Sequence, residues 1–236
     1  MKTLVAKRLL LAAFATLVLA GLTGCATTAN NPKDPYEGFN RAMFSVNEGI
    51  DVVVKPVAQG YDTITPQLVK SGIGNFFGNI ADVWTALNNF LQGKGVEGVS
   101  DFGRVLVNTT IGIAGLFDVA SEMGFEKHSE DFGQTLGAWG VGDGAYFVWP
   151  VIGPRTTRDT FGFAVDSYAD PIPRIDNVPV RNTLMGIRLI DTRASLLPVD
   201  KVVEQAAFDK YDYIRDAYLQ NRRSVIHDGN PPAEEQ

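Results

Sequence analysis

The stretch that decides the fold is Asn75-Phe76-Phe77-Gly78-Asn79-Ile80-Ala81-Asp82-Val83-Trp84-Thr85-Ala86-Leu87-Asn88-Asn89-Phe90-Leu91-Gln92, which Gly93 ends. Its apolar residues recur at offsets of three and four, the period of an amphipathic helix. The opposite face is rich in asparagine and carries almost no charge, whereas the outer side of an ordinary surface helix carries Lys and Glu. The stretch therefore predicts a helix with one aromatic face and one amide face.

Three further helices are expected along the chain. An early helix follows Asp34-Pro35 and carries apolar residues at Phe39, Met43, Val46 and Ile50. Another begins after Asn177, with Pro179 in its first turn, and ends before Pro198. The stripe Val203, Ala207, Tyr211, Ile214 and Tyr218 predicts one solvent-facing helix near the C-terminus. Strand signals are scarce, so the fold class is mostly α, with a single helical domain over residues 34–226.

The segment from Gly133 to Gly153 mixes glycines with large aromatic side chains. Glycine permits left-handed backbone and close approach of other groups, so this composition predicts an irregular apolar loop. The loop is either a buried, turn-rich connector or a surface that meets lipid or lines a passage, and composition favours neither. The residues singled out for the second interpretation are Trp139, Gly140, Gly142, Tyr146, Phe147 and Trp149.

The first 24 residues have the layout of a secretory signal. Lys2, Lys7 and Arg8 precede an apolar run from Leu9 to Ala20, which is shorter than the roughly twenty residues needed to cross a bilayer. Leu22-Thr23-Gly24-Cys25 then resembles the lipobox of bacterial lipoproteins, whose cysteine is acylated and becomes the mature N-terminus. An ordinary signal peptide followed by an unrelated thiol is the alternative. Against it, Cys25 is the only cysteine and stands at the expected cleavage position.

The lipobox resemblance implies an anchor and a location. Three acyl chains on Cys25 would make attachment effectively permanent, since a single chain binds a membrane only marginally. Ala26 after the cysteine points to the outer membrane. Residues 25–33 are expected to form a tether and residues 227–236 a disordered acidic tail.

The mature chain is acidic. Removing residues 1–24 takes away three positive charges and no negative ones, so the formal net charge changes from −6 to −9. This balance argues against nucleic-acid binding, which needs a basic patch. It also argues against electrostatic docking on anionic headgroups, so contact with lipid is expected to be apolar.

Catalytic or metal chemistry has little support in the sequence. A hydrolase needs a nucleophile with a base, or a metal with its ligands, and His128 and His227 are the only histidines. His128-Ser129-Glu130-Asp131 is expected to be a solvated turn, because adjacent residues do not converge on one point. The aspartates that could bind a cation lack calcium-loop spacing and are expected to cap helices and turns; they are Asp131, Asp143, Asp159, Asp166 and Asp170. The prediction is no enzyme, no metal site and no cofactor beyond the acyl chains on Cys25.

An ordered series of motifs resembles the MlaA (also VacJ) family of lipoproteins. It opens with Asp34-Pro35-Tyr36-Glu37-Gly38-Phe39-Asn40-Arg41 and continues through the helix of residues 75–92. Its most specific part is Glu130-Asp131-Phe132-Gly133-Gln134-Thr135-Leu136, and it ends with Tyr218-Leu219-Gln220-Asn221-Arg222. One departure is Gly144-Ala145-Tyr146, where the family has Gly-Pro-Tyr. The resemblance spans Asp34 to Arg222.

The resemblance implies a ring or disc of amphipathic helices around a channel. Such a protein lies in the inner leaflet of the outer membrane, with its lipid anchor on the periplasmic side. Phospholipids that have strayed into the outer leaflet would pass through the channel to a soluble periplasmic carrier, which is linked to an ATP-driven complex in the inner membrane. Trimeric outer-membrane porins are the other implied partners. Two further classes stay open: an outer-membrane phospholipase, and a structural porin-associated lipoprotein that transports nothing.

Each face of the 75–92 helix receives a role on this basis. We expect Phe76, Phe77, Ile80, Trp84 and Leu87 to face lipid or the core of the ring. Asn75, Asn79 and Asn88 are candidates for the channel side, because amides hydrogen-bond headgroups and water at a lower cost than charges. The glycine and aromatic segment would flank the lipid path, since irregular backbone at membrane depth must line a cavity or be covered by protein. An uncharged path predicts little selectivity among headgroups.

Overall fold

The computed structural model describes residues 31–232. The predicted signal peptide, Cys25, residues 26–30 of the predicted tether and the last four residues lie outside this described range. Within it the chain is mostly helical, which confirms the predicted fold class. The elements in chain order are α2 (Glu37–Ile64), α3 (Gln67–Leu91), α4 (Gly95–Thr110), α5 (Val119–Glu122), α6 (Phe132–Ala138), β1 (Tyr146–Trp149), β2 (Gly153–Thr156), α7 (Thr157–Ala169), the 3-10 turn η1 (Ile172–Arg174), α8 (Val178–Ser195), α9 (Leu197–Ala206) and α10 (Lys210–Ile226).

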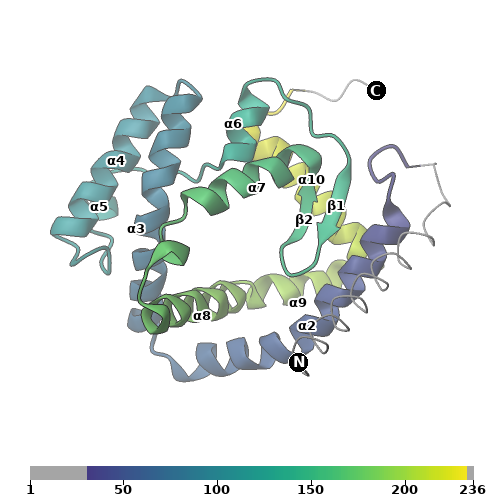
Figure 1. Cartoon of the computed structure of the whole chain (residues 1–236), viewed down its shortest axis with the longest axis horizontal. Helices are drawn as coiled ribbons and strands as arrows, with labels where there is room; N and C mark the ends of the chain where they lie inside the picture. Colours follow the sequence, from purple (N-terminus) through teal and green to yellow (C-terminus); the bar gives the residue numbers. More distant parts are fainter. Residues whose placement is uncertain (1–30, 233–236) are drawn as a thin grey trace, which may run out of the picture.

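The elements follow one another around a ring (Figure 1). Helix α3 packs against α8, α8 packs against α2, and α2 packs against β1 of the hairpin. Strand β2 contacts α7, α7 packs on α6, and α6 returns to α3. Helices α4 and α5 form a lobe on the outer side of α3 (Figure 1). The circuit joins segments far apart in sequence, so closing it depends on tertiary contacts.

The boundaries of α8 follow from its sequence. Its N-cap residue Asn177 accepts a hydrogen bond from Val180 N at 3.1 Å, and Pro179 occupies the first turn, where no backbone donor is needed. The helix ends at Ser195, before Pro198. The prediction for this helix is confirmed, as is the early helix after Asp34-Pro35, which is α2.

The C-terminal stripe forms two helices, so the prediction of a single one is wrong. Helix α9 ends at Ala206 and α10 begins at Lys210. Asp209 caps the second helix by accepting from Tyr211 N at 2.9 Å and Asp212 N at 3.3 Å. A side-chain acceptor that competes for these amides breaks the helix while the apolar period continues through it.

The segment Gly133–Gly153 is more regular than the predicted irregular loop. It contains α6 and the first strand of an antiparallel hairpin, in which Tyr146 pairs with Thr156 and Trp149 with Gly153. Two asparagines of α2 hold the hairpin. Asn40 accepts from Val148 N at 2.9 Å and donates to Tyr146 O at 3.0 Å, and Asn47 accepts from Val151 N at 2.7 Å and donates to Trp149 O at 2.9 Å. These amides satisfy the strand edge as a third strand would.

Candidate functional site

The amide face of α3 is its buried face. Asn88 is fully buried, donates to Trp84 O at 2.9 Å and accepts from the Thr135 hydroxyl of α6 at 2.7 Å. Asn89 donates to the carboxylate of Asp101 on α4 at 2.8 Å. Asp82 and Thr85 on the same face are also buried. The helix therefore packs against its neighbours in the ring through polar side chains.

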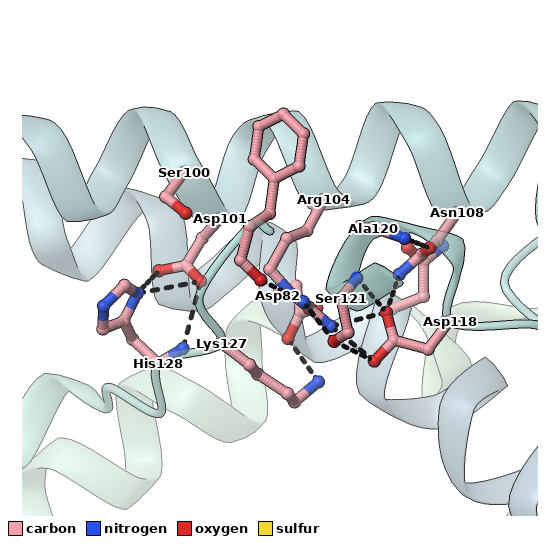
Figure 2. Close-up of polar contacts among 12 residues, drawn as sticks. Asp82, Ser100, Asp101, Arg104, Asn108, Asp118, Ala120, Ser121, Lys127 and His128 are labelled. Carbon is pink, nitrogen blue, oxygen red and sulfur yellow. Dashed lines mark hydrogen bonds and ion pairs between the residues drawn. The ribbon is translucent and has the colours of Figure 1, made fainter. Parts of the chain in front are cut away.

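Arg104 of α4 is the centre of this polar interior (Figure 2). Its side chain is 1% exposed, and its Nη2 donates to both carboxylate oxygens of Asp118 at 2.9 Å. It also contacts Asp82 at 3.4 Å and donates to Ser121 Oγ at 2.9 Å. The pKa of Asp118 is lowered, because hydrogen bonds from Ser121, Asn108 and Arg104 outweigh the burial that would raise it. The ion pairs of Arg104 with Asp82 and Asp118 therefore link α4 to α3 and to the N-terminal end of α5.

Most of the helices expose large apolar side chains. Val53 of α2 is 71% exposed, Val96 of α4 is 82% exposed and Phe161 of α7 is 68% exposed. Among the described residues, most buried side chains are polar or charged, and large apolar side chains are exposed on almost every helix. Monomeric soluble proteins rarely expose extended apolar surface, which marks contact with a membrane or a partner. The helices of the described range thus bury mainly polar side chains and expose large apolar ones, the reverse of the pattern in a soluble protein.

A cavity of about 720 Å³ lies against α3, between α4, the C-terminal end of α7 and α8. Phe77, Ile80 and Trp84 of α3 and Val105 of α4 supply apolar walls. This size and apolar character are typical of ligand pockets, which measure about 300–1,000 Å³.

The charged girdle of the cavity consists of Asp166, Asp170 and Arg188. All three also line a second cavity of about 320 Å³, so they stand where the two cavities adjoin. Arg188 Nη2 pairs with Asp170 at 2.6 Å. Asp166 accepts from Trp84 Nε1 at 2.7 Å and from Phe132 N at 2.9 Å, and burial raises the pKa of its carboxyl. The lining of this cavity is therefore charged, unlike the path that the sequence led us to expect.

The charged girdle could not be predicted from the sequence, because its residues lie on two separate elements. Asp166 and Asp170 stand one turn apart on α7 and at its C-terminal end, and Asp170 does accept from Ile172 N at 3.0 Å, as a turn-capping residue would. Arg188 comes from α8, 18 residues after Asp170. The i, i+4 spacing of two acids is the only local signal.

Of the α3 residues that the sequence singled out for lipid contact or for the channel, some line the cavity and others contact neighbouring elements or are exposed. Phe77, Asn79, Ile80 and Trp84 line the cavity. Phe76 packs edge-on against Phe77, with ring centroids 5.3 Å apart, and Leu87 is 44% exposed. Asn75 donates to Leu116 O at 3.2 Å, and Asn88 is sealed against α6. The structure brings together four of these residues, and their side chains are mostly aromatic and aliphatic.

The predicted residues of the glycine and aromatic segment lie outside the lining of this cavity. Trp139 is exposed and donates to Leu91 O at 2.9 Å, and Trp149 donates to Thr160 Oγ1 at 3.0 Å. Tyr146 is buried in a small core with Val148 and Tyr211, and Phe147 stacks on Tyr36 with centroids 5.0 Å apart. Gly140 has a φ of +88°, and neither it nor Gly142 has a neighbouring atom within 4 Å of an added Cβ.

His128, the first residue of the segment His128-Ser129-Glu130-Asp131, packs against the carboxylate of Asp101. His128 Nδ1 lies 3.2 Å from Asp101 Oδ2, and its backbone N donates to the same group (Figure 2). The expectation of a solvated turn is wrong at this residue. Residues 31–232 contain no group of three or more His, Cys, Asp or Glu side chains arranged to hold a metal ion. In the same range no helix combines the length and hydropathy needed to cross a bilayer.

Known proteins resemble this chain over nearly the whole range that the structure describes. The sequence model of the MlaA lipoprotein family matches residues 32–225. The "Intermembrane phospholipid transport system lipoprotein MlaA" of Escherichia coli is 34% identical over 227 residues, which cover 94% of this chain and 90% of the relative. The protein of the same name in Haemophilus influenzae is 31% identical, covering 91% and 90%.

A solved structure shows the same fold. It is described as "Structural basis for maintenance of bacterial outer membrane lipid asymmetry" and is 33% identical to this chain, with a TM-score of 0.71. The match covers 82% of this chain and 98% of the solved one. Family match, curated relatives and solved structure agree with the resemblance of the motifs, and the chain belongs to the MlaA lipoprotein family.

Proposed function

We propose that this lipoprotein removes phospholipids that have strayed into the outer leaflet of the outer membrane. The observation that carries the proposal is an amphipathic cavity lined by α3, α4, α7 and α8, in a ring whose helices expose large apolar side chains. The exposed apolar side chains suit the hydrocarbon of one leaflet, while the cavity offers aromatic walls for acyl chains and a charged girdle for a headgroup. The names of the relatives support phospholipid as the substrate class.

The anchor and the partners belong to the same proposal. Acylated Cys25 would hold the ring on the periplasmic side of the outer membrane, embedded in its inner leaflet. Lipid leaving the cavity would be taken by a soluble periplasmic carrier linked to an ATP-driven complex in the inner membrane. A trimeric porin would stabilise the ring in the bilayer by covering part of its exposed apolar surface.

The test is the outer-leaflet phospholipid content of cells that lack the protein, complemented with matched variants. Ala81→Trp fills the cavity from its α3 wall, whereas Ala164→Trp places the same side chain at an exposed position of α7 outside the lining. We expect wild type and Ala164→Trp to restore normal content, and Ala81→Trp and Cys25→Ala to fail. Full rescue by Ala81→Trp would exclude this cavity as the path.

The turn before the hairpin has a separate proposed role in lipid passage. Gly142 has open space around its Cβ position and no left-handed φ, so Gly142→Leu fits without steric conflict. Gly140 has a φ of +88°, at which any side chain is strained by about 1–2 kcal/mol. If Trp139, Tyr146, Phe147 and Trp149 flank a moving path, Gly142→Leu should fold normally and still impair lipid removal. Full activity of this variant would remove the segment from the path.

The phospholipase alternative needs a nucleophile with a base beside the cavity, and the lining of the cavity contains no histidine or cysteine. Purified protein incubated with phospholipid should release no free fatty acid. The structural alternative predicts that deletion leaves outer-leaflet phospholipid unchanged, which the complementation experiment measures directly.

A further inference from the structure

The charged girdle has an uneven balance of charge. Three carboxylates line the larger cavity, those of Glu130, Asp166 and Asp170, and Arg188 is the one basic side chain in the lining. Glu130 is paired with Lys94 at 3.1 Å, and Asp170 is paired with Arg188. Asp166 forms no ion pair with any described residue, and its hydrogen bonds come from two neutral N–H groups. The girdle therefore has one carboxylate in excess.

Arg188 retains donors for a ligand. Only its Nη2 is hydrogen-bonded to a described residue, and its guanidinium lies 6.0 Å from the centre of the Phe77 ring in the cavity wall. A guanidinium presents five N–H donors in a planar fork that matches phosphate geometry. Nε and Nη1 can therefore contact a phosphate while Nη2 keeps Asp170 in place.

A second polar group of the wall is incompletely bonded. Asn79 is 7% exposed and lines the cavity, and its Nδ2 donates to Thr109 Oγ1 at 2.9 Å. Its Oδ1 is buried and has no hydrogen-bond donor in the structure. Buried acceptors are nearly always satisfied, so an unsatisfied one beside a cavity points to a donor that the empty protein lacks.

We propose that the cavity prefers phospholipids whose headgroup carries a primary ammonium next to the phosphate, with Arg188 contacting the phosphate and Asp166 and Asp170 receiving the ammonium. This inference rests on the proposed function of the cavity and adds headgroup preference to it. Phosphatidylethanolamine meets both requirements. Phosphatidylglycerol brings a net negative charge to a girdle that already has an excess carboxylate. Phosphatidylcholine carries a cation that cannot donate a hydrogen bond.

Trp84 provides a reporter inside the site. Its ring lines the cavity and its Nε1 donates to Asp166. The other tryptophans, Trp139 and Trp149, are replaced by Phe in the acylated full-length protein, which is then placed in nanodiscs of phosphatidylcholine. Brominated phosphatidylethanolamine, phosphatidylglycerol or phosphatidylcholine is added at increasing mole fraction, and quenching of Trp84 measures occupancy.

We expect half-maximal quenching at a mole fraction about threefold to fivefold lower for phosphatidylethanolamine than for phosphatidylglycerol, the effect of one partly exposed ion pair. Asp166→Asn keeps an oxygen for Trp84 Nε1 and Phe132 N but removes the charge, and it should abolish most of this preference. Arg188→Gln should raise the half-maximal fraction for every class. Asp176→Asn, an exposed carboxylate outside both cavities, is the matched control and should change nothing.

The outcomes separate the two proposals. Equal quenching by all three lipids, or a preference that survives Asp166→Asn in a protein with unchanged thermal unfolding, would overturn the headgroup preference and leave lipid entry intact. Absence of quenching by any brominated lipid would overturn lipid entry into this cavity and the preference with it.

Discussion

Arg104 shows at the residue scale how this protein depends on polar contacts inside it. Its side chain is 1% exposed and pairs with the carboxylates of Asp82, which also contacts Lys127 at 2.9 Å, and of Asp118, which is 27% exposed. Removing one partner of a buried pair leaves a charge without compensation, which costs about 3–5 kcal/mol. Arg104→Ala should lower the free energy of unfolding by that amount, measured by denaturant titration in detergent. Lys201→Ala, at an exposed position of α9, is the control and should shift it by less than about 0.5 kcal/mol.

Arg104→Lys refines this prediction. Lysine keeps the charge but cannot place separate donors on Asp82, Ser121 and Asp118 as the guanidinium does, so it should recover only part of the stability. Stability equal to wild type in Arg104→Ala would mean that water or relaxation compensates the two carboxylates.

Asp159 gives the interior a defined sensitivity to acid. Burial raises the pKa of its carboxyl, but the charge of Arg222, with hydrogen bonds from Arg222 and Tyr218, brings it down to about 2. Because the folded pKa lies below the unfolded value near 3.8, the contribution is complete above pH 4 and is lost as the pH falls toward 2. The gap in unfolding free energy between wild type and Asp159→Asn should be about 2 kcal/mol near neutral pH and close over this window. A gap independent of pH would assign the loss to packing.

At the element scale, the periodicity of apolar residues predicted the long helices but not which face of α3 packs against the rest of the protein. The 3.6-residue period separates two faces without stating which one meets the protein. Asn88 was expected on the channel side and is buried, because its amide bonds Trp84 O and Thr135 in the contact with α6. Local signals also could not reveal the girdle, since Asp170 and Arg188 meet only when the C-terminal end of α7 packs near α8.

The β-hairpin is the element for which the sequence carries the weakest signal. Its strands have four residues each, too short for a clear alternation, and α2 supplies the missing hydrogen bonds. Asn47→Ala removes the acceptor of Val151 N and the donor to Trp149 O. We expect faster amide exchange at Val151 and a loss of about 1–2 kcal/mol in local opening free energy. Ser45→Ala, whose hydroxyl contacts only Arg41 O of the same helix, should leave the hairpin protected.

At the scale of the whole molecule, an acidic chain presents an apolar exterior. Buried carboxylates such as Asp82 and Asp159 are paired inside, so they do not give the outer surface the charge that solubility requires. An exterior of this kind is stable in hydrocarbon, where the outward side chains cost nothing and the polar groups satisfy one another. These exposed apolar side chains fit the proposed embedding of the ring in one leaflet. None of the helices within residues 31–232 is long and apolar enough to span a bilayer.

This arrangement predicts a pattern of shielding around the ring. Single cysteines at Val53, Val96 and Phe161 replace exposed apolar side chains of three different helices, while Glu126→Cys replaces a carboxylate that is 89% exposed. In nanodiscs of purified protein, a membrane-impermeant maleimide should label Glu126→Cys readily and the other three at least about tenfold more slowly, because lipid excludes the reagent. Purified protein without a porin separates shielding by lipid from shielding by a partner. Dissolving the nanodiscs in mild detergent leaves a micelle over the same belt, so protection should persist there and disappear only on unfolding. Equal labelling at all four positions in nanodiscs would mean that the apolar belt faces water, and the membrane-embedded ring would have to be abandoned in favour of a surface reserved for another protein.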